Sequence, residues 1–104
     1  MSAAANPARG ECAVRVDGCE LVLRPSFQAL VAAEQELGSL FDLVTRAADG
    51  KLAIGELVAL FWHCLREPPA GMTRETLGES LVALGLAQLT PVLRHLLHQI
   101  LAGR

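Results

Sequence analysis

The stretch that decides the fold is residues 12–24, CAVRVDGCELVLR, in which two short apolar runs flank the dipeptide Asp17-Gly18. Asp-Gly suits a two-residue type I′ turn, because both central residues of that turn need φ > 0. Pairing the two runs across this turn sets Arg15 opposite Glu20. The sequence therefore predicts an antiparallel β-hairpin over residues 11–24.

The predicted register sorts the side chains of the hairpin onto two faces. The polar face sets Arg15 opposite Glu20 and Glu11 opposite Arg24, so that opposite charges meet across the strands. Cys12 and Cys19 lie about 13 Å apart along the strands, which is too far for a disulfide, and we interpret both as small core hydrophobes. The apolar face is expected to contain Cys12, Val14, Val16, Cys19, Leu21 and Leu23.

The hairpin needs helices to cover its apolar face, since an isolated two-stranded hairpin is marginal in water. Ser26, Ser39 and Thr73 are candidate N-caps of three helices, and Thr90-Pro91 is typical of a cap and first-turn pair. A further helix is expected from about Ile54 to Arg66, where Ala53 stands in place of a Ser or Thr cap. We expect inward-facing stripes that include Phe27, Leu30, Val31 and Leu37 in the first helix and Leu89, Val92, Leu93, Leu96, Leu97, Ile100 and Leu101 in the last.

These elements predict an α+β fold, mostly α, in which the N-terminal hairpin packs on a small bundle of about five helices. At 104 residues the chain fits a single domain spanning 1–104. Within it we expect a loose leader over 1–10, the hairpin over 11–24 and a helical part over 26–103.

The charge pattern argues against several classes of partner. The formal net charge is −2 and the basic residues form no cluster, which predicts no binding of nucleic acid or of an anionic membrane. No apolar stretch approaches the roughly 20 residues of a membrane span. The first nine residues lack the apolar core of a signal peptide, so we expect the protein in the cytoplasm.

No pattern in the chain predicts catalysis, a cofactor or a metal site. His63 and Cys64 are neighbours, but adjacent helical side chains point about 100° apart and cannot form a nucleophile pair. His95 and His98 are spaced to share a metal ion, yet no cysteine or acid in their helix completes a site. We therefore predict a protein that is not an enzyme and needs no cofactor.

The third predicted helix is apolar around most of its circumference, which leaves two interpretations open. It is either the central helix of the bundle, or one of its faces meets another chain. Trp62, with Phe61 and Val58, is the predicted partner-binding group, because large aromatic side chains are common anchors at interfaces. Glu34 is also a predicted partner-binding residue, because its charge lies within the apolar stripe of the first helix. The alternative explanation for a charge there is a position at the boundary of the core, or an ion pair with an arginine.

The hairpin offers a second means of association. A two-stranded sheet leaves unpaired N–H and C=O groups on both outer edges, which can pair with another copy or with an extended partner segment. Together with the apolar third helix, this predicts a homo-oligomer.

Several stretches resemble the tail-assembly chaperones of gene transfer agents and related tailed phages. They are Asn6-Pro-Ala-Arg-Gly-Glu11, Val16-Asp-Gly18, Leu23-Arg24 followed by Ser26-Phe-Gln-Ala-Leu30, Glu34 through Gly38, and Gly71-Met-Thr-Arg-Glu-Thr-Leu-Gly78 through Leu84-Gly85. The likeness extends over roughly Asn6 to Gly103 and lies in pattern and order, with Ala53 as a departure.

The resemblance implies a role in tail assembly. Such chaperones bind the long, apolar, helical tape-measure protein, keep it soluble and help recruit tail-tube protein, and are then absent from the finished particle. The resemblance implies no catalytic residues. Two alternatives stay open: a small structural tail or head-completion component retained in the virion, and a small dimeric DNA-binding regulator.

Overall fold

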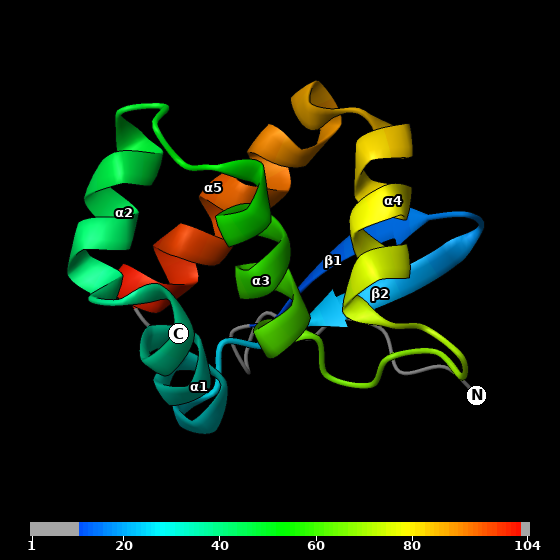
Figure 1. Ribbon diagram of the computed structural model, residues 1–104, viewed down its shortest axis with the longest axis horizontal. Coiled ribbons are helices and arrows are strands. Elements are labelled where there is room, and N and C mark those ends of the chain that lie inside the picture. The colour runs from blue at the N-terminus through cyan, green and yellow to red at the C-terminus, as the bar shows by residue number, and fades with distance from the viewer. Residues whose placement is uncertain (1–10, 103–104) are drawn as a thin grey trace.

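The computed structural model describes residues 11–102, so the predicted leader lies outside the described residues (Figure 1). Strands β1 (Cys12–Val16) and β2 (Cys19–Leu23) form the predicted antiparallel hairpin, and Cys12 pairs with Leu23. Asp17 and Gly18 have φ of 50° and 75°, as a type I′ turn requires. The hairpin and its register are thus confirmed.

Five helices follow the hairpin, which confirms an α+β fold that is mostly α. Helix α3 packs between α1 and α4, and α5 crosses the hairpin on the side of β1 (Figure 1). Helix α2 packs chiefly on α1 and stands apart from the others. The helices are α1 (Phe27–Leu37), α2 (Leu40–Ala48), α3 (Ile54–Cys64), α4 (Arg74–Leu84) and α5 (Leu86–Ala102).

The predicted N-caps of α1, α2 and α4 are confirmed. The Ser26 hydroxyl accepts a hydrogen bond from the backbone N–H of Ala29 at 3.2 Å, and Ser39 and Thr73 do the same for their helices. Ala53 has no side chain that can cap α3. Instead the Glu56 carboxylate accepts from the Ala53 N–H at 3.0 Å, which supplies the reciprocal half of a capping box.

The predicted start of the last helix at Thr90-Pro91 is wrong. Helix α5 begins at Leu86 and contains Pro91 in its interior. The missing N–H of Pro91 costs only one bond near the helix start, and the Thr90 hydroxyl donates to the Leu86 carbonyl at 3.3 Å. Leu89 is buried ahead of the proline, so the additional turn gains core contacts that a helix starting at Thr90 would lack.

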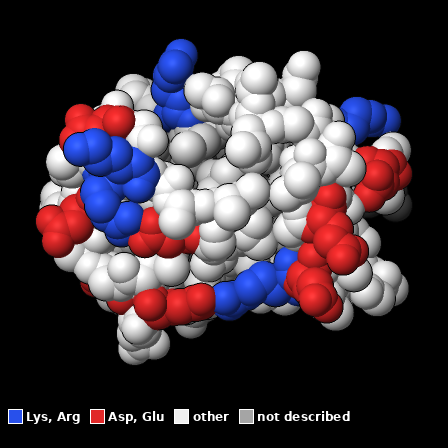
Figure 2. Space-filling model, turned by 45° about the horizontal axis from the view of Figure 1, so that its top comes forward, with Lys and Arg blue, Asp and Glu red and all other residues white. Residues whose placement is uncertain are grey.

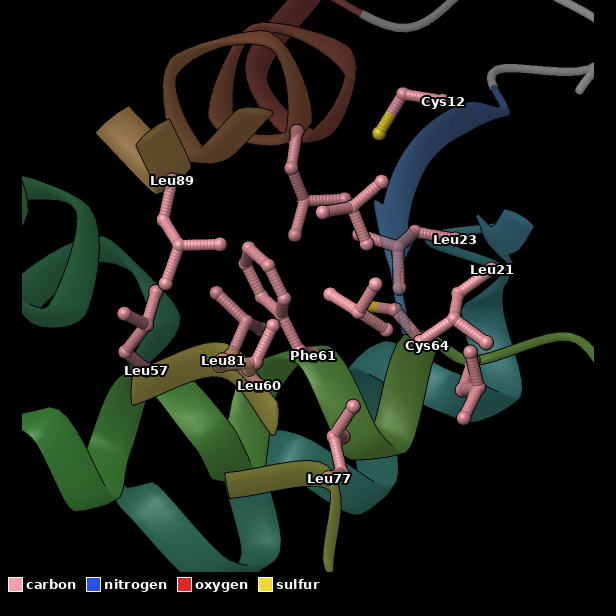
Figure 3. Packing of buried hydrophobic residues seen from close by; sticks show 14 of the residues in the cluster. Cys12, Leu21, Leu23, Leu57, Leu60, Phe61, Cys64, Leu77, Leu81 and Leu89 are labelled. Atoms are coloured by element: carbon pink, nitrogen blue, oxygen red, sulfur yellow. The ribbon is translucent and has the colours of Figure 1, made fainter. Parts of the chain in front are cut away.

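The core forms where α3, α4 and α5 cover the inner face of the hairpin. Phe61 is fully buried, and its ring lies at the centre of the cluster (Figure 3). Leu57 and Leu89 lie on one side of the ring, and Leu23 and Cys64 lie on the other (Figure 3). The fully buried side chains include Leu21, Leu23, Leu43, Leu60, Phe61, Leu77, Leu81, Leu89 and Leu96.

Three residues that we expected inside lie at the surface. Cys19 is exposed at the hairpin tip, at the margin of what the helices cover. Phe27 opens α1 and is 83% exposed, because the inward face of this helix begins one turn later at Leu30. Leu101 is 60% exposed near the end of α5, beside the gap that separates α5 from α2.

The segment after α3 completes the sheet in an unexpected way. Helix α3 ends at Cys64, two residues before the predicted end, and the following residues run along β2. The Arg24 N–H donates to the Cys64 carbonyl at 2.7 Å, and the Arg66 N–H donates to the Val22 carbonyl at 2.9 Å. The expectation that both hairpin edges are open is therefore wrong for this end of β2.

The same segment supplies a buried ion pair. The Arg66 guanidinium lies 2.9 Å from Glu11, whose side chain is fully buried. Glu11 was expected to face Arg24 across the hairpin, but Arg24 is exposed and the carboxylate turns toward the chain after α3. A buried carboxylate needs such a partner, so this pair fixes where the segment joins the hairpin.

We predict that Arg66→Leu lowers the free energy of unfolding by about 3 kcal/mol, because it leaves the buried Glu11 carboxylate without this guanidinium. Urea denaturation followed by circular dichroism measures the effect. Arg15→Leu is the control. Arg15 is exposed, and its guanidinium lies as far as 4.0 Å from the Glu20 carboxylate, so its loss should change stability by less than about 0.5 kcal/mol. Equal losses in the two variants would contradict the prediction.

Candidate partner-binding surface

Helix α3 is the central helix, which decides between the two interpretations of its apolar circumference. Phe61, predicted to bind a partner, is fully buried in the core and has no surface to offer in this conformation. Trp62 and Val58 are half-buried and pack against the core from its margin. A role of Trp62 or Val58 in partner binding stays a prediction.

Glu34 has a local structural role. Its side chain is exposed, and one carboxylate oxygen accepts a hydrogen bond from the backbone N–H of Leu40 at 3.1 Å. Leu40 is the first residue of α2, so the carboxylate caps this helix and favours the positive end of its dipole. This position agrees with the boundary explanation, and a role of Glu34 in partner binding stays a prediction. Glu34 also lies on the rim of an apolar groove.

That groove runs between α2 and α5, and we call it the α2–α5 groove. It consists of three adjoining hollows of about 370, 470 and 260 Å³. The first two hollows share Ala47 and Leu93, and the last two share Val44 and Leu101, so they form one continuous depression. It exists because α2 packs chiefly on α1, so that Val44 and Ala47 of α2 face α5 across an open space.

Large apolar side chains mark both ends of the α2–α5 groove. Phe41 is 78% exposed and lies at one end with Leu101. Leu86 and Ile54 are about half exposed and lie at the other end. Figure 2 shows a broad uncharged surface on one face of the molecule, with Arg, Lys, Asp and Glu gathered toward its margins. Exposed apolar surface of this extent is typical of an interaction site.

A second hollow lies between α3 and α4, and we call it the α3–α4 groove. It has a volume of about 790 Å³ and is lined by Ile54, Gly55, Val58, Gly78 and Val82. Three charged residues of α4 form its rim: Arg74, Glu75 and Glu79. Of the predicted partner-binding residues, Val58 is the one that this groove includes.

The sequence interpretation did not include the exposed apolar residues that line these grooves. Leu101 was expected on an inward-facing stripe, Ile54 was expected at the start of the third helix, and Phe41 and Leu86 were not singled out. Helical periodicity places a residue on a face, but it cannot show whether another helix covers that face. A helix that has more apolar positions than one buried face requires carries a second apolar face, and this criterion was applied to the sequence of α3 alone.

Ion pairs fasten the helices around the grooves. Glu36 of α1 accepts two hydrogen bonds from the Arg74 guanidinium and lies 2.8 Å from His63 Nε2, which ties α1 to α3 and α4. Arg74 and then His63 lower the pKa of Glu36 to about 2. Across the molecule, Arg46 of α2 forms a bidentate pair with Glu56 and lowers its pKa to about 2, with help from the Ala53 N–H.

Neither a reactive buried thiol nor a metal-binding cluster is present among the described residues. Burial raises the pKa of the Cys64 thiol to about 12 and that of Cys12 to about 11, so both thiols stay protonated at neutral pH and are poor nucleophiles. Within residues 11–102, no three His, Cys, Asp or Glu side chains are grouped to hold a metal ion. What this surface offers is apolar area for another macromolecule.

Within residues 11–102, no single helix is both long and apolar enough to cross a membrane. Helices α4 and α5 reach that length and composition only when taken together, and the chain bends by 115° between them.

Comparison with known protein families identifies one family whose model matches the chain. Residues 9–103 match the family described as phage tail tube protein, GTA-gp10. The chain belongs to this family. The match covers nearly the whole chain, including the hairpin and both grooves, and associates the protein with the tails of phages and gene transfer agents. Searches of curated proteins and of solved structures returned no match.

The family assignment supports the broader part of the resemblance. It establishes a structural or assembly role in phage-type tails, in a family of tail proteins that are not enzymes. The description names the tail tube, and a chaperone function is not part of it. The family assignment indicates interaction with other tail components, and it does not identify the tape-measure protein as one of them.

The low pKa of Glu36 predicts a pH-dependent contribution to stability. Its ordinary value is 4.5 and the folded value is about 2, so its ion pairs stabilise the fold above about pH 4.5, and this contribution is lost as the pH falls toward 2. We expect Glu36→Gln to lower the urea midpoint at pH 7 and to leave it unchanged near pH 2. Glu79→Gln is the control and should match wild type at both pH values. A Glu36→Gln deficit that persists undiminished at pH 2 would contradict this account.

Proposed function

We propose that this protein is a tail-assembly chaperone of a gene transfer agent or tailed phage. It binds apolar helical segments of the tape-measure protein in the cytoplasm of the producing cell and keeps them soluble until tail-tube protein assembles around them. The observation that supports this most strongly is the continuous apolar groove between α2 and α5.

The shape of the α2–α5 groove suits a helical client. Its three hollows follow one another along α5, a helix of 17 residues, so a partner helix can lie lengthwise against several of its turns. Val44 and Ala47 of α2 form one wall, and Leu93 and Leu97 of α5 form the other. A helix with leucine-like residues at i, i+3, i+4 and i+7 presents the matching ridge.

The energetics of the groove favour a client that is insoluble alone. Phe41 and Leu101 are largely exposed in the free protein, and each gains about 1.5–3 kcal/mol when fully covered. A long apolar helix gains in the same way, because its own exposed stripe is removed from water. Each partner thus covers surface that would otherwise promote aggregation.

The family description favours a second candidate, a tail-tube component that remains in the virion. In that case the apolar grooves form subunit contacts in the finished tube, and the protein is a stoichiometric part of purified particles. The chaperone function predicts that the protein is abundant in producing cells and absent from particles. Quantitative mass spectrometry of purified particles separates the two.

A single exposed phenylalanine tests the site. We predict that Phe41→Glu weakens binding of the co-expressed tape-measure protein by about 10- to 100-fold, because about 1.5–3 kcal/mol of apolar burial is lost. The measurements are the soluble fraction and co-purification of the tape-measure protein, followed by titration of its soluble helical fragments. Circular dichroism should show an unchanged fold, since Phe41 is 78% exposed.

Phe27→Glu is the matched control. Phe27 is the same residue type and is 83% exposed, but it lines neither the α2–α5 groove nor the α3–α4 groove. It should leave binding unchanged. Equal loss in both variants would indicate general stickiness of exposed aromatics, and no loss in either would remove the α2–α5 groove as the binding site.

A further inference from the structure

The α3–α4 groove is a separate feature that the proposed function does not use. It lies on the other side of the N-terminal part of α3 from the α2–α5 groove, and Ile54 borders both. Val58 and Val82 face it from the two helices, and Val82 is 56% exposed. Its volume of about 790 Å³ exceeds that of any single hollow of the α2–α5 groove.

Two glycines inside helices open onto this groove. Gly55 lies in the first turn of α3 and Gly78 in the middle of α4, where glycine destabilises a helix relative to alanine. A Cβ added at Gly55 would meet nothing within 4 Å. A Cβ at Gly78 would lie 3.5 Å from a Val58 methyl group, an ordinary contact. The packing within the protein would therefore allow alanine at both positions. A partner backbone that lies close to the two helices would need the space that the glycines leave.

The charges on the rim define what kind of partner fits. Glu75 and Glu79 are four residues apart on α4, a spacing at which like charges repel. Within the described part of the chain, neither carboxylate forms an ion pair. Arg74, the one cation on the rim, is already held by Glu36. The rim is thus acidic, and its complement is a pair of Lys or Arg side chains one helical turn apart.

Among the described helices of the chain, one pair of basic side chains has the spacing of this complement. Arg94 and His98 of α5 are exposed at that spacing, but they border the α2–α5 groove, so a second copy that used them would cover the proposed client site. Arg46 of α2 is bound to Glu56. The charge pattern therefore favours a different protein over a second copy.

We propose that the α3–α4 groove binds an amphipathic helix of a second partner protein, with small or apolar residues on its buried face and Lys or Arg at i and i+4 on its flank. Its backbone passes over Gly55 and Gly78, and its basic residues pair with Glu75 and Glu79. With a different client in the α2–α5 groove, the protein can hold two helices side by side.

Two synthetic probes test this site with the full-length protein. One is a fluorescein-labelled helical peptide with an Ala/Leu face and Lys at flanking i and i+4 positions, and the other has Glu in place of Lys. Fluorescence anisotropy should show that the Lys peptide binds wild type at least about tenfold more tightly than the Glu peptide, with affinity falling as salt is raised. Equal affinity for the two peptides, or no binding of the Lys peptide at high micromolar concentration, would overturn the proposal.

Variants of the groove give the second arm. Gly55→Ala and Gly78→Ala should raise or maintain the thermal midpoint while weakening the Lys peptide severalfold, a combination that a purely structural role of the glycines would not produce. Glu75→Lys/Glu79→Lys should abolish binding of the Lys peptide and favour the Glu peptide. Unchanged affinity in these variants would refute the site.

The same measurements distinguish this site from the α2–α5 groove and from self-association. Phe41→Glu should leave binding of the Lys peptide intact, so failure of the proposed chaperone function and failure of this inference give different results. A wild-type dimer in light scattering that Glu75→Lys/Glu79→Lys converts to monomer would overturn the proposal in favour of a second copy.

Discussion

The structure depends on covering one face of a short hairpin. Strands of five residues cannot shield their own apolar side chains, so Leu21 and Leu23 are buried only because helices from the rest of the chain lie over them. Phe61 at the centre of α3 fills the space between the hairpin and α4 and α5. The segment after α3 then pairs with β2 and brings Arg66 to the buried Glu11, which joins helix and hairpin by hydrogen bonds as well as by packing.

This arrangement accounts for the open grooves. A chain of 104 residues has enough apolar side chains for its helices to be apolar on more than one side, but a single small core can bury only one face of the helices at its periphery. Helix α3 is central and has its apolar circumference largely satisfied. Helix α2 packs chiefly on α1, and its remaining apolar face forms a wall of the α2–α5 groove. The ion pairs Glu36–Arg74 and Arg46–Glu56 hold the helices in place at the margins, so the grooves are features of the folded protein.

Membership of the tail family and the surface of the protein point in the same direction. A tail protein works by binding other tail components, and this one presents apolar grooves with different rims: the α2–α5 groove has Arg94, His98 and Glu34 beside it, and the α3–α4 groove has Glu75 and Glu79. Different rim charges favour different partner helices, because the acidic rim of the α3–α4 groove attracts a basic helix more strongly than the mixed rim of the α2–α5 groove does. Two sites that differ in charge suit a protein that brings two chains together during assembly.

The sequence by itself determined the hairpin, its register, three of the helix caps and the class of fold. These features depend on local rules: Asp17-Gly18 fixes a turn, alternation fixes the faces of the strands, and Ser26, Ser39 and Thr73 fix helix starts. The tertiary structure alone decided that Phe61 is core, that Phe41 and Leu101 are exposed, that Glu11 pairs with Arg66, and that α5 continues through Pro91. Each of these depends on which element lies opposite a given face, and that contact joins residues far apart in the chain, where local periodicity carries no information.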